Sequence, residues 1–521
     1  MLKSIPLLLT ASLLSVSLSA SASSAPERVL LQKLAADSIT IKWRYPANET
    51  TAEPVCVSAI GQVQQDEPHC AASTITDGGH GEATITGLRA DTLYQYQIGD
   101  LSDPHFRFRT PADHNALPAD GNTRILIVGD SGTQSEPSHA GEAAQVTAGY
   151  RAYNTRLGNQ EALDLFVVLG DTAYVVGTDQ QWQQAFFEVY PDILSSTLVL
   201  PTIGNHEMGY GSFPCEAMRM CGDKPAGTLL SYGGLSFSAD PNSYDGNRDG
   251  RADPNGLPYL SIFSLPQRGE SGGVASGTEQ YYSVDYNNVH VVSLDSQLSA
   301  RDPAQMSAMR DWLISDLSAN ELDWTVVIFH HPPYSKGTNH DSDSVPQRGP
   351  VDMPQKDMRE QFTPLFEAHG VDMVFSGHSH SYERSYYLRG LSVSSPEMAP
   401  LNQYTELDQN GKPDAGRTRP YSQLSETSGG VDDRVIYTVA GNGGKADAAP
   451  GPRDNAEQWL RHPAHVPQPT DQLDGGCSSD HGCHHGLAVK GSVVLDADRH
   501  SLRARFVDVN GDVLDEFTIT R

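Results

Sequence analysis

The sequence predicts a mixed α+β and α/β chain in which a small antiparallel β-sandwich precedes a larger domain of buried strands and helices. Residues 27–110 contain segments such as "SITIKWRY" and "LYQYQIG", in which apolar and polar residues alternate with period two. Such alternation is typical of antiparallel strands with one buried face. From residue 124 onward, short apolar segments such as "RILIVGDSG" alternate with helix-like segments such as "PAQMSAMRDWLISDLSA". That order predicts an α/β core.

The N-terminal segment has the pattern of a cleaved secretory signal. Lys3 is followed by an apolar stretch to about Leu18 and then by small residues, so we place the signal at residues 1–22. No other apolar run approaches the ~20 residues that are needed to cross a bilayer. We therefore expect a secreted or periplasmic protein.

Turn-rich segments divide the rest of the chain. We expect a sandwich at residues 25–112 and, after a linker rich in Pro and Asn, a catalytic domain at 120–450. Period-two alternation returns at 484–521, which we expect to form closing strands of the catalytic domain. Two long segments rich in Gly, Pro and Asp, 211–280 and 386–432, are expected to be surface loops.

The composition argues against several classes of partner. Asp and Glu number 65 against 36 Lys and Arg, so the formal net charge is −29. A field of this sign repels nucleic-acid phosphates and anionic lipids, and we expect neither nucleic acid nor a membrane as a partner. A small phosphorylated substrate can still be attracted by a local cation. The oligomeric state is left open.

Six cysteines fall in three local pairs, which predicts short-loop disulfides in an oxidising compartment. The pairs are Cys56 with Cys70, Cys215 with Cys221, and Cys477 with Cys483. For the last pair zinc binding is the rival interpretation, because "CSSDHGCHH" also contains His481, His484 and His485.

Polar side chains stand at the ends of the predicted buried strands. The apolar strands run into five motifs, "GDSG", "GDTAY", "GNHE", "VIFHHPP" and "GHSH". In "GHSH" the two histidines are two residues apart, and in extended backbone such side chains point to the same side. In α/β sheets the chemistry collects at the carboxyl ends of the strands. The residues concerned are Asp130, Asp171, Tyr174, Asn205, His206, His330, His378 and His380.

This set of donors predicts a site for two metal ions. Carboxylate and amide oxygens combined with imidazole nitrogens suit Fe, Zn or Mn, and the lack of a thiolate argues against a soft metal. Two cations roughly 3.5–4 Å apart share a carboxylate, hold a phosphate and generate hydroxide from water. For "GHSH" taken alone, a polar loop without a metal is the alternative interpretation.

The motifs resemble those of the purple acid phosphatases, a family of the metallophosphoesterase superfamily. The family pattern of GDxG, GDxxY, GNHE, VxxH and GHxH is met in full between Gly129 and His380. The resemblance implies a four-layer α/β/β/α metallophosphoesterase domain behind a fibronectin III-like β-sandwich. It covers residues 124–385 and extends more weakly to the sandwich and to the terminal "VLDEFTITR".

The resemblance also implies a role for each ligand. The implied ligands of a ferric ion are Asp130, Tyr174 and His380, those of a divalent Fe, Zn or Mn ion are Asn205, His330 and His378, and Asp171 would bridge the two ions. Tyr174 discriminates best, because a phenolate on Fe(III) gives the charge-transfer colour of the family. A core tyrosine after a strand is the alternative at that position.

Two further histidines are candidate catalytic residues. His206 follows a ligand and is expected to contact the phosphate or to protonate the leaving alkoxide as a general acid. Its alternative role is a hydrogen bond to a ligand. His340 falls where the family places a second such histidine, although "SKGTNHDSD" departs from the family's aromatic-rich loop. His331 is expected to fill space or to donate a hydrogen bond.

A second, independent cation site is predicted in "DGNRDGRAD". Oxygen-bearing side chains at Asp245, Asn247, Asp249 and Asp253 resemble the first nine positions of an EF-hand calcium loop. The match ends at Gly256, which stands where such a loop has Glu. A calcium-stabilised insertion and a solvated acidic turn both remain open.

Together these features predict a secreted acid phosphatase that hydrolyses phosphate monoesters by attack of a metal-bound hydroxide on phosphorus, with activity at acidic to neutral pH. A phosphodiesterase or nucleotidase on the same dimetal core is the alternative, although such enzymes usually lack the Tyr174 position. A third interpretation is a non-catalytic binding or adhesion module, against which the intact ligand set argues.

Overall fold

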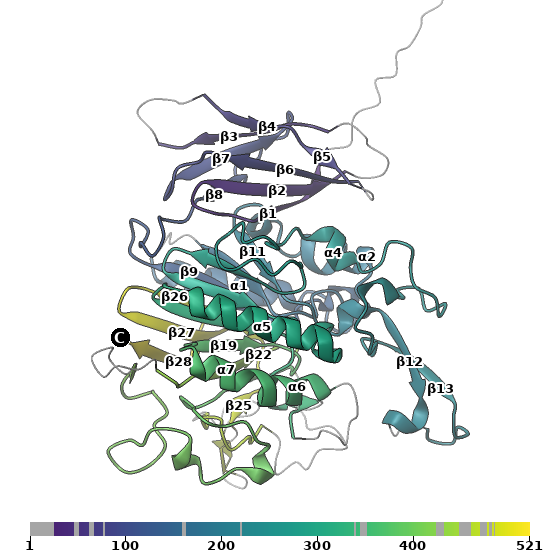
Figure 1. Cartoon of the computed structure of the whole chain (residues 1–521), viewed down its shortest axis with the longest axis vertical. Coiled ribbons are helices and arrows are strands. Elements are labelled where there is room, and N and C mark those ends of the chain that lie inside the picture. The colour runs from purple at the N-terminus through teal and green to yellow at the C-terminus, as the bar shows by residue number, and fades with distance from the viewer. Residues whose placement is uncertain are drawn as a thin grey trace, which may run out of the picture.

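The computed structural model of the 521-residue chain (Figure 1) describes most of the sequence. The described residues are 26–45, 52–61, 67–76, 79–158, 163–218, 221–337, 340–343, 352–423, 432–446, 460–468, 477–478, 482–483 and 485–521. The predicted signal at residues 1–22 lies outside them, as do His481 and His484 of the predicted zinc alternative.

The N-terminal region is a sandwich of antiparallel sheets. Side chains of β7 (Leu93–Ile98) alternate between buried and exposed, as the period-two sequence predicts. Trp43, Tyr94 and Tyr96 are buried in the core. One side of the sandwich holds β1 (Glu27–Gln32), β2 (Ser38–Arg44), β6 (His80–Thr86) and β5 (Thr74–Ile75), and the other holds β4 (His69–Ala71), β3 (Val55–Ala59), β7 and β8 (Arg107–Arg109).

The larger region is built on two sheets. In the first, β9 (Thr123–Val128), β10 (Leu165–Val168) and β11 (Leu198–Pro201) run parallel. The parallel strands of both sheets are buried along their whole length, as expected where both faces of a sheet are covered. The second sheet has the order β14 (Tyr282–Tyr286), β15 (Val289–Ser293), β16 (Trp324–Phe329), β19 (Met373–Ser376), β22 (Ile436–Ala440), β20 (Tyr382–Arg384) and β25 (Gly486–Leu487).

Helices cover the outer faces of these sheets, which confirms the predicted four-layer α/β/β/α order (Figure 1). The helix α1 (Glu142–Arg156) contacts strands of the first sheet. On the second sheet, α5 (Pro303–Ala319) shares a hydrophobic cluster through Leu313 with Val327. The other α-helices of the described residues are α2 (Asp179–Trp182), α3 (Pro191–Leu194), α4 (Pro258–Ile262), α6 (Met353–Asp357) and α7 (Thr363–Ala368).

The C-terminal strands extend the first sheet. β26 (Gly491–Ala497) pairs antiparallel with β9, with Val493 opposite Ile127. β27 (Ser501–Asp508) and β28 (Val513–Thr520) then follow outward as antiparallel neighbours, and the short β21 (Tyr421–Ser422) pairs with β28 at the edge. The last part of the chain therefore lies beside β9, on the side opposite β10.

The sandwich and the larger region share a hydrogen-bonded boundary, which the sequence pattern did not predict. β1 lies beside β11 with Leu31 opposite Leu198, so a single sheet runs from one region into the other. The Gln32 side-chain amide donates to the Val199 carbonyl at 3.2 Å. The sandwich is therefore anchored to the strand that precedes the "GNHE" motif.

The insertion at 211–280 contributes a hairpin that projects from the body of the molecule (Figure 1). In this hairpin β12 (Tyr210–Pro214) pairs with β13 (Leu229–Gly233). Two smaller pairs are β17 (Lys336–Gly337) with β18 (His340–Asp341), and β23 (Cys477–Ser478) with β24 (Gly482–Cys483).

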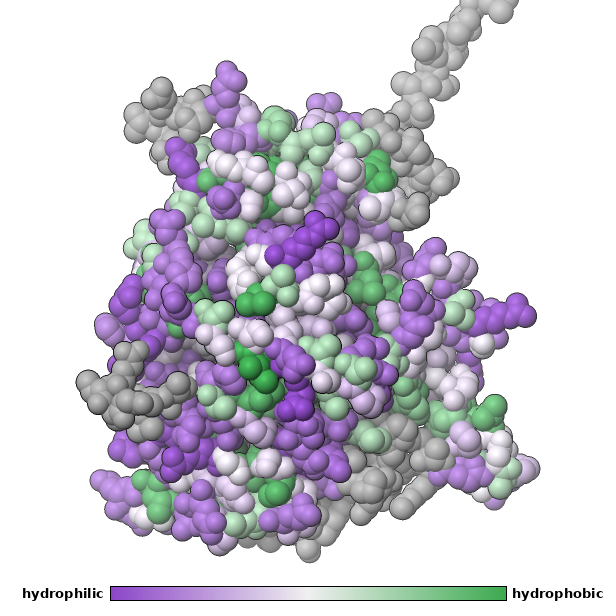
Figure 2. Space-filling model, in the orientation of Figure 1, coloured by the Kyte–Doolittle hydropathy of each residue, from purple (hydrophilic) through white to green (hydrophobic). Residues whose placement is uncertain are grey.

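The visible surface is mainly polar. Figure 2 shows a face dominated by hydrophilic residues, with apolar residues in small scattered groups. Within the described part of the chain, no helix has both the length and the apolar character that would let it span a bilayer.

Candidate metal centre

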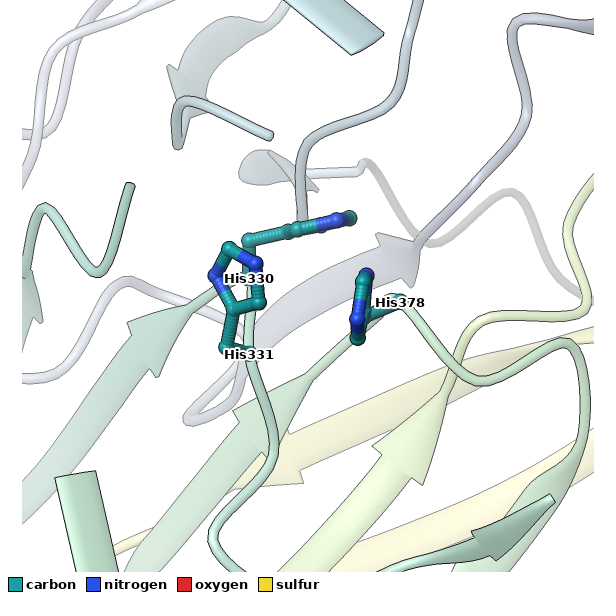
Figure 3. A group of neighbouring side chains, drawn as sticks. All are labelled: His330, His331 and His378. Atoms are coloured by element: carbon teal, nitrogen blue, oxygen red, sulfur yellow. The ribbon is translucent and has the colours of Figure 1, made fainter. Parts of the chain in front are cut away.

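The predicted ligands converge from the carboxyl ends of strands in both sheets. Parallel strands of one sheet end at the same edge, so residues that follow them are brought close together. Figure 3 shows the imidazoles of His330 and His378, with that of His331, at the ends of β16 and β19. Asp130 follows β9, Asp171 follows β10, Asn205 follows β11, His330 follows β16, and His378 and His380 follow β19.

Three of the predicted ligands hold strained backbone. The φ angles of Asp130, Asp171 and His378 are 53°, 51° and 68°, in the left-handed region that residues other than glycine seldom adopt. Such strain persists only where surrounding contacts impose it, and it clusters at functional sites. Gly204 leaves room for the Asp171 carboxylate, because a Cβ at position 204 would lie only 2.4 Å from Asp171 Oδ1.

The first group of ligands surrounds the hydroxyl of Tyr174. That oxygen lies 3.1 Å from Asp130 Oδ1, 3.2 Å from Asp171 Oδ2 and 3.2 Å from His380 Nε2. Tyr174 is fully buried, yet its polar end points at three other predicted ligands. The structure thus brings together the whole set that the resemblance assigns to a ferric ion.

The second group surrounds the amide oxygen of Asn205. Asn205 Oδ1 lies 3.1 Å from His330 Nε2 and 3.0 Å from His378 Nδ1. His330 Nε2 in turn lies 3.4 Å from Asp171 Oδ2. The Asn205 amide nitrogen donates to the Gly234 carbonyl at 2.9 Å, which turns the oxygen toward the two imidazoles. Asp171 therefore faces both groups with the same oxygen.

The buried donors of this centre cannot all ionise on their own. Burial, then the charges of Asp130 and Asp171, raise the pKa of Tyr174 well above its ordinary value. Burial, only partly offset by the charge of His330, raises the pKa of Asp130. The pKa of Asp171 is lowered despite burial, because His330 and His206 place positive charge beside it. The donor set therefore fits metal cations, which would neutralise all of these groups together.

Glu207 supports this centre in a way that the sequence did not reveal. It is fully buried. Its Oε2 accepts the backbone N–H groups of Asp171 (2.9 Å) and Gly204 (2.7 Å), and its Oε1 accepts those of Thr172 (2.7 Å) and Ala173 (3.3 Å). One carboxylate thus ties "GDTAY" to "GNHE". Its place within the motif was visible in the sequence, but its contacts were not.

Lys445 is a second residue that motif analysis missed. Its ammonium lies 3.8 Å from the centre of the Tyr174 ring and 3.5 Å from the Glu136 carboxylate. Lys445 follows β22 in "GNGGK", a sixth strand end at the same edge, where the Gly443 N–H donates to the Gly129 carbonyl. A positive charge therefore sits over the aromatic face of a predicted ligand.

The two candidate catalytic histidines lie on the open side of the centre. The side chains of His206 and His340 are 21% and 19% exposed, whereas His330 and His378 are almost fully buried. His206 Nδ1 donates to the Val175 carbonyl at 2.7 Å, which leaves Nε2 to face the site, 4.0 Å from Asp171 Oδ2. The His340 ring lies 3.7 Å from that of His378, measured between ring centres.

His331 lies within the cluster but is held away from the open side. Its N–H and Nδ1 both bond to the Ser296 hydroxyl, at 3.1 and 3.0 Å. Burial, and then the neighbouring imidazoles of His378 and His330, lower its pKa, so it stays neutral. His330, His331 and His378 offer nitrogens within 4.8 Å of one another, yet only His330 and His378 contact Asn205.

The predicted calcium loop folds against the residues that follow "GNHE". Tyr210 N–H donates to the Asp245 carbonyl at 2.7 Å. The Asp245 and Asp253 carboxylates accept backbone N–H groups of their own loop, and Asn247 donates to Asp253 at 3.2 Å. Asp249 likewise accepts a backbone N–H of the loop, that of Arg251. Calcium binding at this loop stays a prediction.

Two of the three predicted cysteine pairs form disulfides. Cys56 and Cys70 join β3 to β4, and Cys215 and Cys221 close a short loop after β12. Cys477 and Cys483 stand opposite each other in the pairing of β23 with β24, but their side chains lie outside the described residues.

Comparison with known proteins identifies a phosphoesterase domain. Residues 123–382 match the calcineurin-like phosphoesterase family. Purple acid phosphatase 22 of Arabidopsis thaliana is 27% identical over 303 residues, which cover 58% of this chain and 52% of that protein. The chain thus spans about half the length of the curated relatives that it matches.

Two solved structures share the fold over nearly the whole chain. The purple acid phosphatase PPD1 from yellow lupin (Lupinus luteus) seeds has a TM-score of 0.61 at 18% identity and covers 96% of this chain and 75% of that one. PhoD has a TM-score of 0.53 at 12% identity and covers 95% of this chain and 91% of that one. These findings confirm the resemblance that the motifs indicate. Residues 123–382 are a calcineurin-like phosphoesterase domain, in a chain whose curated homologues include purple acid phosphatases.

Proposed function

We propose that this chain hydrolyses phosphate monoesters with two metal ions, in the manner of a purple acid phosphatase. The observation that carries the proposal is the position of Asp171 Oδ2. It lies 3.2 Å from the Tyr174 hydroxyl and 3.4 Å from His330 Nε2, so one carboxylate oxygen faces both ligand groups. A bridge between two cations requires this arrangement, and a single ion would leave one group of ligands unused.

The two groups differ in chemistry, and the difference supports a mixed pair of ions. The group around the hard phenol oxygen of Tyr174, with Asp130 and His380, suits Fe(III). The group of Asn205, His330 and His378 suits a divalent Fe, Zn or Mn ion. When bound, such a pair supplies Lewis-acid stabilisation of phosphoryl oxygens and activates water.

The partly open histidines support a substrate position on one side of the centre. His206 and His340 are the side chains that a phosphate ester would meet on approach, because the ligands behind them are buried. His206 Nδ1–H is used by the Val175 carbonyl, so Nε2 is the nitrogen that faces the substrate. In the protonated imidazolium, Nε2 would carry the proton that passes to the leaving oxygen. His340 would orient the phosphate or share that role.

The experiment that tests the proposal compares a monoester with a diester. Protein reconstituted with iron and zinc is assayed with p-nitrophenyl phosphate and bis(p-nitrophenyl) phosphate, and the chelated protein serves as the control. We expect higher kcat/KM for the monoester and loss of both activities on chelation. Preference for the diester would instead support the phosphodiesterase alternative. Metal binding without hydrolysis of either ester would overturn the enzyme proposal and favour a binding module.

We also propose that the protein is exported to the periplasm or the medium. The Cys56–Cys70 and Cys215–Cys221 bonds support this, because such disulfides form and persist in oxidising compartments. Cell fractionation and N-terminal sequencing test it. We expect a mature chain that begins near residue 22, outside the cytoplasm. A full-length cytoplasmic chain with free thiols would contradict export.

A further inference from the structure

Asp352 stands at the start of α6 but does not cap that helix. An Asp in this position ordinarily accepts a backbone N–H of the first turn. Here the side chain makes no such bond and is 1% exposed. It points instead toward the candidate metal centre, where no motif places a ligand. Helix capping therefore does not explain why this acidic side chain is buried.

One oxygen of Asp352 receives three donors. Oδ1 lies 3.1 Å from His340 Nδ1, 3.2 Å from His378 Nε2 and 3.2 Å from Gln355 Nε2. The other oxygen, Oδ2, has no hydrogen-bond partner among the described residues. Burying a carboxylate with one oxygen unsatisfied is unfavourable for stability. The contacts to the two histidines therefore indicate a functional purpose.

The contact with His378 determines which nitrogen of that ring is free. An ionised carboxylate only accepts hydrogen bonds, so His378 Nε2 carries the proton. In a neutral imidazole the other nitrogen then has a lone pair. That nitrogen, Nδ1, lies 3.0 Å from Asn205 Oδ1, in the group that would hold the divalent ion. Asp352 thus presents His378 in the form that binds a metal.

The contact with His340 has a parallel effect on the open side. His340 Nδ1 donates to Asp352, so Nε2 is the nitrogen left for the substrate. The His340 ring packs 3.7 Å from that of His378 and 6.0 Å from that of His380, measured between centres. Both histidines therefore depend on a single buried oxygen for their orientation.

We propose that Asp352 is a positioning residue that couples the divalent-metal ligand His378 to the substrate-facing His340. This inference deepens the proposed function and, for His340, rests on it. Loss of the shared acceptor should weaken metal binding through His378 and misplace His340 at the same time. A residue with a merely structural role would lower stability without either specific effect.

The test uses Asp352→Ala, with Asp352→Asn as the conservative variant and Asp311→Asn, an exposed residue of α5, as the control. Zn²⁺ is titrated into metal-free protein and the heat is measured, which needs no activity. We expect Asp352→Ala to weaken the site by about 10–100-fold, the usual effect of losing such a supporting contact. Asp352→Asn retains a neutral acceptor and should lose about 5-fold, the difference between a charge-assisted and a neutral hydrogen bond.

A second measurement isolates the effect through His340. Saturated with metal, Asp352→Ala, His340→Asn and the double variant are assayed with aryl phosphates of graded leaving-group pKa. We expect kcat to fall with the same dependence on leaving group in each single variant, and the double variant to match His340→Asn. Wild-type zinc affinity in both Asp352 variants, or a double variant whose kcat falls by the product of the two single losses, would overturn the proposal. If wild-type protein fails to bind two metals or to hydrolyse monoesters, the proposed function fails instead.

Discussion

Two largely buried clusters of histidine and aspartate lie on the same scaffold, and only one of them has the properties of a metal centre. The other, which we call the His290 clamp, consists of His290 on β15, Asp285 on β14 and Asp316 on α5. His290 Nδ1 lies 2.6 Å from Asp285 Oδ1, and Nε2 lies 2.9 Å from Asp316 Oδ2. Despite burial, these two bonds raise the pKa of His290 to about 9. When His290 is protonated, each of its two N–H groups donates to one carboxylate, so a single added proton satisfies the hydrogen bonds of the clamp.

The metal centre differs from the clamp in electrostatics and in backbone. Its groups have pKa values driven apart, with Asp130 and Tyr174 raised and Asp171 lowered. Three of its ligands have positive φ, whereas no residue of the clamp does. The presence of buried His and Asp is therefore not what marks a metal site. A metal site is indicated instead by a set of ligand atoms whose charges are not balanced by the protein itself and whose backbone is strained.

The largest effect is expected from Asp171→Asn, which removes the one carboxylate that both ligand groups share. The loss of several kcal/mol of charge stabilisation corresponds to a decrease in kcat/KM of about 1,000-fold. We also expect loss of bound metal, measured by elemental analysis alongside hydrolysis of p-nitrophenyl phosphate. Asp311→Asn is the matched control. Wild-type activity in Asp171→Asn would remove the basis for a bridged pair.

His206→Asn tests whether the partly exposed His206 acts as a general acid, a role that the buried metal ligands do not have. A general acid contributes about 100-fold or more, so kcat should fall by at least that factor, most steeply for alkyl phosphates. Metal content should stay at the wild-type level, because the predicted ligands do not include His206. His105→Asn, at an exposed site, is the control. Equal losses for all leaving groups would argue that His206 only stabilises a ligand.

His290→Gln should affect stability and leave metal content and activity intact. The folded pKa of about 9 exceeds the ordinary value of 6.5, so the clamp stabilises fully below pH 6.5 and loses this contribution as pH rises through 9. The shift corresponds to roughly 3 kcal/mol. Denaturant unfolding at pH 6 and pH 9.5 measures it, with His105→Gln as the control. If His290→Gln destabilises the protein as much at pH 9.5 as at pH 6, His290 does not carry the positive charge assigned to it.

Glu207→Gln should give the smallest effect of this series. The amide NH₂ would place a donor against backbone N–H groups that now meet a carboxylate, and the "GDTAY" and "GNHE" loops would shift slightly. We expect zinc affinity to fall by about 10–100-fold, measured by calorimetry on metal-free protein. The exposed Glu397→Gln is the control. Unchanged affinity would show that the loops keep their position without this charge.

The sequence alone predicted residues that follow buried strands, because strand ends combine an apolar run, a glycine and a polar residue in a fixed order. Asp130, Asp171 and His378 could be found in this way. Asp352 could not, because Asp before a proline-containing helix turn is typical of an ordinary cap. Its role depends on where the start of α6 places its carboxylate relative to the His340 and His378 rings, which no local pattern records.

The same limit applies to the larger fold. The alternation in β7 and the apolar runs of β9 and β16 predicted the sandwich and the α/β core. The joining of β1 to β11 through Leu31 and Leu198 was not predictable, because it depends on how two independently patterned sheets meet at their edges. His290 was overlooked for a related reason, since one of its two partners, Asp316, lies on a helix and 26 positions further along the chain.

The most direct test is a crystal structure of protein loaded with iron and zinc, with anomalous scattering recorded at both absorption edges. We predict two peaks roughly 3.5–4 Å apart, with iron against Tyr174 and zinc against Asn205 and His378, and with Asp171 in contact with both. A single peak, or peaks away from Asp171 in fully active protein, would contradict the account.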